Sequence, residues 1–209
     1  MLRPLLAALV LTLGADTLPA QSSNAGDEPV EIVRTTSNEI FDQIELSREH
    51  FEDNPDALRT VVRELLLPHI DVIYSGRLVL GRASRGVERD KVVAFAEAMS
   101  ELLIDRYATG LLEFRTRDQI EVLPLQGEND ERVTKVRTRV TMNNGKTAPV
   151  DYVFRRSDAG WQIFDVIVEG ISYVATFRNQ IGEQIRRQGF DATLAQLQSG
   201  NLQLDVEGG

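Results

Sequence analysis

The stretch GWQIFDVIVEGISYVATFR, residues 160–178, decides the fold. Its first half is a strand in which both alternating sets of side chains are apolar, and the strand ends at Glu169 and Gly170. A strand that is apolar on both faces must pack against other groups on both sides. Ser172 then begins an amphipathic helix. Its apolar stripe consists of Val174, Phe177, Ile181 and Ile185. The segment therefore predicts a sheet covered on both faces, either by protein or by an apolar ligand.

Upstream of this stretch the hydrophobic pattern repeats every two residues. We expect strands at 118–125, 132–142 and 150–154, and Asn144-Gly145 is a favoured hairpin turn between the second and third of them. Together with the strand that begins at Trp161 they predict a four-stranded antiparallel meander.

Helical patterns precede and follow the predicted meander. We expect helices at 29–46, from Asn54-Pro55-Asp56 to Pro68, and at 88–114, with residues 69–85 as an apolar connector. The chain closes with helices at 172–188, ended by Gly189, and at 191–198. Helices first, a meander next and helices again indicate an α+β fold, in which a helical N-terminal subdomain packs on the sheet.

The N-terminus reads as an export signal. Arg3 precedes an apolar run that is too short to span a bilayer, and Leu18-Pro19-Ala20 is a plausible cleavage site. We therefore divide the chain into a signal peptide (1–20), a polar tether (21–28), a helical subdomain (29–114), the sheet with the C-terminal helices (115–204) and a tail (205–209). The expected location is the periplasm.

Composition excludes several classes of function. The chain has 209 residues and a formal net charge of −9, which argues against a nucleic-acid-binding protein, since such proteins neutralise phosphates with Lys and Arg. It has no Cys, which excludes a disulfide scaffold, a thiol enzyme and a thiolate metal site.

The sequence offers little catalytic chemistry. His50 and His69, the two histidines, do not stand in a metal-ligand spacing, and we expect both to be surface or capping residues. Asp165 is a carboxylate among apolar neighbours. It could serve as a general base with a shifted pKa, or it could fix the following turn by accepting hydrogen bonds. Because no histidine or second acid lies nearby in the sequence, we favour the structural role.

In their order and spacing, several segments resemble the MlaC family of periplasmic phospholipid-binding proteins, also called toluene-tolerance proteins. The residues that carry the resemblance are Tyr74, Leu80-Gly81-Arg82, Phe95, Leu103, Tyr107, Gly160-Trp161, Asp165, Glu169-Gly170, Ser172, Gly189, Asp191 and the leucines at 194 and 197. The resemblance implies an NTF2-like sheet and a carrier without a cofactor, and we expect a monomer. It also implies that the carrier moves phospholipid between an outer-membrane lipoprotein complex and an inner-membrane ABC transporter with an MCE-domain subunit, which maintains outer-membrane lipid asymmetry.

A lipid carrier needs an apolar cavity that excludes water, and the residues that line it should follow the same apolar pattern as core residues. The candidate walls are Ile73, Tyr74, Leu78, Met99, Leu103, Tyr107, Val136, Val140, Tyr152, Phe154, Ile163 and Phe164. Arg82 is the candidate contact for the lipid headgroup. Two alternatives remain open at this point, because the same residues would fill a solid core: an enzyme on a cone-shaped sheet that uses Asp165 as acid or base, and an adaptor module without a ligand.

Overall fold

The structure is a computed structural model, and it describes residues 28–125 and 131–204. The predicted signal peptide, most of the polar tether and the tail lie outside these residues. Within the described ranges, no helix combines the length and the apolar character that crossing a bilayer requires.

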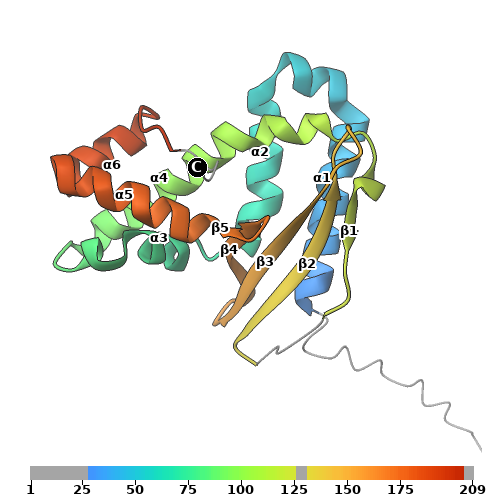
Figure 1. Ribbon diagram of the computed structural model, residues 1–209. Coiled ribbons are helices and arrows are strands. Elements are labelled where there is room, and N and C mark those ends of the chain that lie inside the picture. Colours follow the sequence, from blue (N-terminus) through green and yellow to red (C-terminus); the bar gives the residue numbers. More distant parts are fainter. Residues whose placement is uncertain (1–27, 126–130, 205–209) are drawn as a thin grey trace, which may run out of the picture.

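Two long helices form an antiparallel pair at one end of the molecule (Figure 1). Helix α1 covers Glu28–Asp53 and bends at Ser47, whose φ of −136° leaves the helical region. Helix α2 covers Pro55–Leu66, with Asn54 at its N-cap and proline in its first turn as the sequence predicts. The Arg48 guanidinium donates hydrogen bonds to the carbonyl oxygens of Leu112 and Phe114, which attaches the far end of α1 to the segment after α4.

The predicted connector at 69–85 contains a helix, so that prediction is wrong. Helix α3 covers Val72–Leu80, between the 3₁₀ turns η1 (Leu67–His69) and η2 (Gly81–Ser84). The Asp71 side chain caps α3 by accepting a hydrogen bond from the Tyr74 N–H at 3.0 Å. Gly76 lets α3 approach the next helix closely, because a Cβ at this position would lie 2.4 Å from the Cβ of Ala96.

The long helix α4 covers Arg89–Tyr107 and joins the two ends of the molecule (Figure 1). The 3₁₀ segments η3 (Ala108–Glu113) and η4 (Arg117–Gln119) follow it, so the predicted helix at 88–114 is α-helical only over its first part. The Arg63 side chain of α2 forms a two-pronged ion pair with Glu101 of α4, with Nε at 2.9 Å and Nη2 at 2.5 Å from the carboxylate.

The described residues form one five-stranded antiparallel sheet in the order β1-β2-β3-β4-β5. Its strands are β1 (Ile120–Val122), β2 (Val133–Thr141), β3 (Thr147–Ser157), β4 (Gly160–Val168) and β5 (Ile171–Ser172). The first four are the predicted meander, and the two-residue β5 adds an edge that a periodicity of two cannot reveal in so short a segment. The register between β3 and β4 shifts after Val153, where a bulge bends the sheet.

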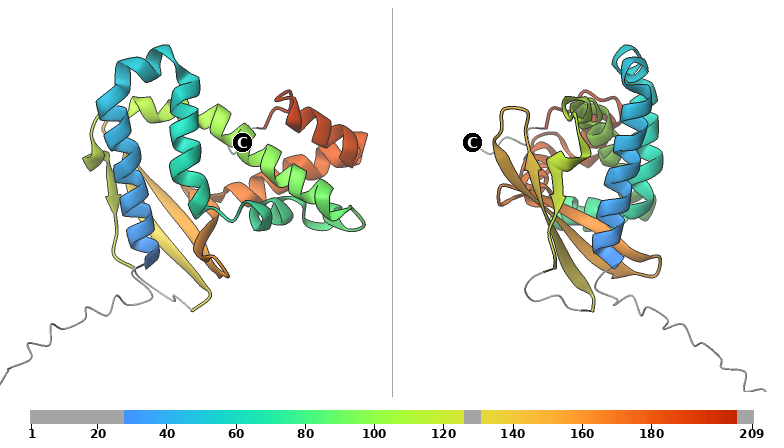
Figure 2. Two further views of the ribbon diagram at one scale, coloured as in Figure 1. Left: turned by 180° about the vertical axis from the view of Figure 1, so that it is seen from behind. Right: turned by 90° about the vertical axis from the view of Figure 1, so that its right-hand side faces the viewer.

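The last two helices of the chain pack against the earlier helices. Helix α5 covers Tyr173–Gln188 and α6 covers Phe190–Gln198; they pack against α3 and α4 (Figures 1 and 2). Gly189 stands between them with φ of +87°, a conformation that favours glycine. The predicted α+β fold, with helices at both ends of the chain and a meander between them, is confirmed.

Three apolar clusters hold these elements together. One joins α3, α4, α5 and α6 around Phe95 and Phe177. A second joins α1, α2, the end of α4 and η3 around Ile44 and Leu58. The third, around Phe154, lies between the N-terminal half of α1 and the sheet, which α1 crosses on one face (Figure 2). The space between the second and third clusters is the part of the molecule that concerns function.

Candidate functional site

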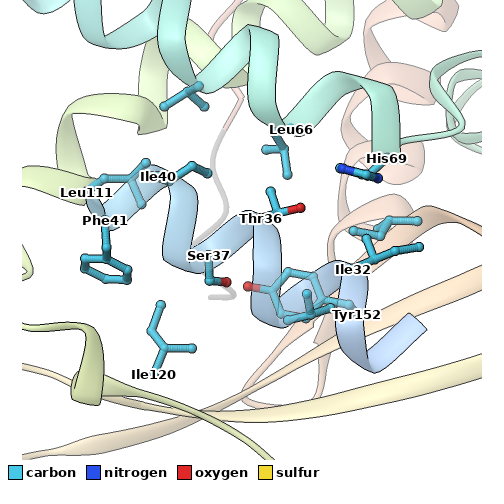
Figure 3. A pocket seen from close by; sticks show the side chains of 13 residues that line it. Ile32, Thr36, Ser37, Ile40, Phe41, Leu66, His69, Leu111, Ile120 and Tyr152 are labelled. Atoms are coloured by element: carbon cyan, nitrogen blue, oxygen red, sulfur yellow. The ribbon is translucent and has the colours of Figure 1, made fainter. Parts of the chain in front are cut away.

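A cavity of about 150 Å³ lies where α1 and α2 face the sheet. Six side chains of α1 line it together with residues of α2, η1, η3, β1, β3 and β4 (Figure 3). The lining residues are Ile32, Val33, Thr36, Ser37, Ile40, Phe41, Val62, Leu66, His69, Leu111, Ile120, Tyr152 and Ile163. Nine of these thirteen are aliphatic residues or phenylalanine, so the cavity is suited to an apolar group.

Local structure explains why these side chains converge. Residues that are three, four or seven positions apart lie near one face of a helix, so Val33, Ile40 and Phe41 lie on the buried side of α1. Val33 packs against the sheet, whereas Ile40 packs against α2. Tyr152 and Ile163 stand on the face of β3 and β4 that α1 covers. Leu111 reaches the cavity because the chain leaves α4 in a 3₁₀ turn, where Arg48 holds the carbonyls of the residues that follow.

Four side chains bring polar atoms to this apolar lining: Thr36, Ser37, His69 and Tyr152. The hydroxyl oxygen of Thr36 is buried and has no hydrogen-bond partner. Burial raises the pKa of the Tyr152 hydroxyl above its usual value of 10.0, because the charged form would lose its hydration. The Tyr152 hydroxyl is therefore neutral at physiological pH and is able to donate a hydrogen bond.

Asp165 has a structural role. One of its carboxylate oxygens accepts a hydrogen bond from the Ser172 hydroxyl at 2.6 Å, and the other accepts one from the Val174 N–H at 3.0 Å. Asp165 thus fixes the start of α5 against β4, as the structural alternative from the sequence proposed. Among the described residues, no group of three or more His, Cys, Asp or Glu side chains could hold a metal ion.

Comparison with known protein families identifies the chain. The family model described as MlaC protein matches residues 34–199, which is more than half of the chain. The chain belongs to the MlaC family. The resemblance inferred from the sequence is therefore confirmed, and the match runs from within α1 to the end of α6.

Similar proteins come from several bacteria. The toluene tolerance protein ttg2D of Pseudomonas putida is 28% identical over 168 residues, which cover 80% of this chain and 77% of that protein. The intermembrane phospholipid transport system binding protein MlaC of Haemophilus influenzae is 24% identical over 186 residues, covering 87% and 86% of the two chains. A solved phospholipid-binding protein from Ralstonia solanacearum, in complex with a phospholipid, shares the fold: the TM-score is 0.71 at 23% identity, over 81% of this chain and 94% of that one.

The structure brings some of the predicted wall residues of this MlaC family member to the cavity. Tyr152 and Ile163 line it directly. Val136 and Phe154 are fully buried in the adjoining cluster between α1 and the sheet. Val140 is buried on β2 and pairs with Ile120, a lining residue of β1. Five of the six predicted sheet residues thus lie at or beside the cavity; the sixth, Phe164, packs against Tyr74 of α3 instead.

The helical half of the predicted set lies elsewhere. Met99 is buried among α4, α5 and α6, and Leu103 packs against the same cluster. Tyr74 of α3 contacts Phe164 edge to face, with ring centroids 5.4 Å apart, and the Arg155 guanidinium carbon lies over the Tyr74 ring, 4.3 Å from its centroid. Ile73 and Leu78 are half-buried on α3, whereas Tyr107 at the end of α4 is exposed. Contact of these residues with a lipid stays a prediction.

Arg82 also lies away from the cavity. It is an exposed residue of η2, at the end of the molecule opposite to α1 and β1 (Figures 1 and 2). The placement of the cavity does not favour Arg82 as a headgroup contact, and its role stays a prediction.

Sequence reasoning missed the contribution of the first two helices. His69 was expected to be a surface or capping residue, but it lines the cavity at the end of η1. The lining residues of α1 and α2 were not among the candidate walls, because a cavity wall and a filled core have the same apolar pattern. One signal was available: Thr36 and Ser37 interrupt the apolar stripe of α1 at positions that line the cavity.

Proposed function

We propose that this chain is a phospholipid carrier that holds acyl chains in the cavity between α1, α2 and the sheet, without covalent chemistry. The observation that carries this proposal is an apolar cavity in a member of the MlaC family. The names of its relatives, a phospholipid transport binding protein and a phospholipid-binding protein solved with a phospholipid, support the same ligand.

The physical problem that such a carrier solves is the exposure of hydrocarbon to water. Burial of each methylene contributes roughly 0.8 kcal/mol, so one 16-carbon acyl chain represents on the order of 12 kcal/mol. A phospholipid therefore leaves a membrane very slowly unless another apolar surface receives its chains. Valine, leucine, isoleucine and phenylalanine side chains of the cavity provide such a surface.

The cavity is too small to receive a whole phospholipid unless the structure changes first. A cavity of about 150 Å³ holds a group the size of benzene, whereas pockets for larger ligands measure about 300–1,000 Å³. Two acyl chains need more room than this, so entry of a lipid requires α1 and α2 to move away from the sheet. The apolar contacts around Val33 and Phe154 would open in that movement, and acyl chains would replace them.

We further propose the periplasm as the compartment and two membrane complexes as the partners. These are an outer-membrane lipoprotein complex and an inner-membrane ABC transporter with an MCE-domain subunit. The word intermembrane in the name of the Haemophilus relative supports an exchange between two membranes. The predicted signal peptide is consistent with export. We also propose that the carrier is a monomer, in which each chain carries one lipid.

Native mass spectrometry of the protein purified without organic solvent tests the proposal. We expect a fraction of the protein to carry the mass of a diacyl phospholipid. Leu111→Trp should lower that fraction because the larger ring fills the cavity. Leu46→Trp is the control, since Leu46 is 80% exposed on α1. A protein that is always lipid-free, and that stays so after incubation with phospholipid vesicles, would contradict the proposal.

A further inference from the structure

Thr36 and Ser37 interrupt an otherwise apolar helix face inside the cavity. The stripe of α1 runs through Val33, Ile40 and Ile44, and Thr36 and Ser37 occupy the turn between them. A threonine within a helix commonly donates its hydroxyl proton to the carbonyl four residues earlier. Thr36 does not do this: it is only 6% exposed, yet its hydroxyl oxygen has no partner. A buried hydroxyl without a partner is costly and calls for a functional explanation.

Two further hydroxyl groups, those of Ser37 and Tyr152, line the same cavity as Thr36. The ring of Tyr152 extends from β3 toward α1, and its oxygen points toward the Ser37 hydroxyl, while the Thr36 oxygen points toward the side where His69 lies (Figure 3). Neither Ser37 nor Tyr152 uses its hydroxyl in a hydrogen bond with any residue that the structure describes. Three hydroxyl groups thus line one apolar cavity and have no hydrogen-bond partner among the described residues.

The chemistry of the lining selects the kind of group that these hydroxyls would bind. A phosphate carries a full charge, which in a buried site needs a cation beside it. The described residues that line the cavity include no lysine or arginine. A neutral oxygen acceptor has a much lower desolvation cost and pairs with a hydroxyl donor. In a phospholipid, the neutral acceptors next to the acyl chains are the ester carbonyls.

We propose that Thr36, Ser37 and Tyr152 form a site for an ester carbonyl of a diacyl lipid. This proposal rests on the proposed function and adds a chemical specificity to it. The site would let the protein recognise where an acyl chain joins the glycerol, and the phosphate would remain outside the cavity. An ether-linked lipid with the same chains and headgroup lacks the carbonyl, so it would leave the hydroxyls unpaired.

The test compares a diester with a diether phosphatidylethanolamine of identical chain length, each displacing a fluorescent phospholipid from the delipidated full-length mature protein. We expect the wild type to bind the diester on the order of three- to tenfold more tightly, which is the effect of about one hydrogen bond. Thr36→Val and Tyr152→Phe keep the shape of the side chains and should reduce this preference toward one. Thr35→Val, an exposed position on the same helix, should keep the wild-type preference.

Other outcomes would overturn the inference. Equal affinity of the wild type for both lipids, or an unchanged preference in both variants, would contradict the carbonyl site and leave the carrier function intact. Tighter binding of a free fatty acid than of either phospholipid would show that the hydroxyls serve a carboxylate instead. Failure of the wild type to bind any of these lipids would overturn the proposed function together with the site.

Discussion

Replacement of Thr36 by valine should make the folded protein more stable, although this residue lies in the cavity wall. The Thr36 hydroxyl is buried without a hydrogen-bond partner. Mutational data place the cost of such a group at roughly 1–3 kcal/mol. Valine has nearly the same shape and brings a methyl group, whose burial is favourable by about 0.8 kcal/mol. We therefore expect the free energy of unfolding to rise by about 1–3 kcal/mol.

Urea denaturation of the lipid-free protein, followed by circular dichroism, measures this change. In a protein of this size, each kcal/mol should also raise the melting temperature by roughly 2–4 °C. Thr35→Val is the matched control, because it makes the same exchange on the solvent side of α1 and should stay within about 0.5 kcal/mol of the wild type. If Thr36→Val were equal to or less stable than the wild type, the hydroxyl would have to be satisfied in the folded protein. The reasoning behind the carbonyl site would then be refuted.

Three further predictions concern the framework around the cavity. Asp165→Asn should lower the free energy of unfolding by about 1–2 kcal/mol, because it weakens the hydrogen bonds that hold the start of α5. The folded variant should bind lipid normally, and a folded variant without lipid binding would contradict the structural role. Gly76→Ala should destabilise by about 1–3 kcal/mol in thermal melting, because α3 and α4 must separate. Gly182→Ala, at a position with room for a Cβ, should be neutral or stabilise by about 0.5–1 kcal/mol. An equal loss of stability in both glycine variants would disprove the tight contact between α3 and α4. Burial raises the pKa of Tyr152, so the unfolded chain ionises first and the free energy of unfolding falls as the pH rises above about 10; Tyr152→Phe should remove part of this fall.

The sheet and the C-terminal helices follow from strong local signals. The Asn144-Gly145 turn, the alternation along β2 and β3 and the glycine at 189 each specify a conformation that the structure contains. The helix α3 was missed because it has only nine residues and contains Gly76, which reads as a helix breaker. Its stability comes from packing against Ala96 and from the Asp71 cap, and only the cap leaves a trace in the local sequence.

The position of the cavity was harder to predict than the fold. An apolar side chain follows the same periodicity whether it meets another side chain or an empty space, so Met99 and Tyr152 looked alike in the sequence. Only the tertiary arrangement distinguishes them: α5 and α6 pack against Met99, whereas Tyr152 borders the cavity. The polar interruption at Thr36 and Ser37 is the local feature that distinguishes the cavity wall from the core.

Transfer of a fluorescent phospholipid between two populations of vesicles shows whether the protein carries lipid. Catalytic amounts of the protein should accelerate this transfer in proportion to their concentration. Leu111→Trp should slow the transfer strongly, and Leu46→Trp should leave it at the wild-type rate. Transfer at the spontaneous rate with the wild-type protein present, or equal acceleration by both variants, would contradict the claim that this cavity carries the acyl chains.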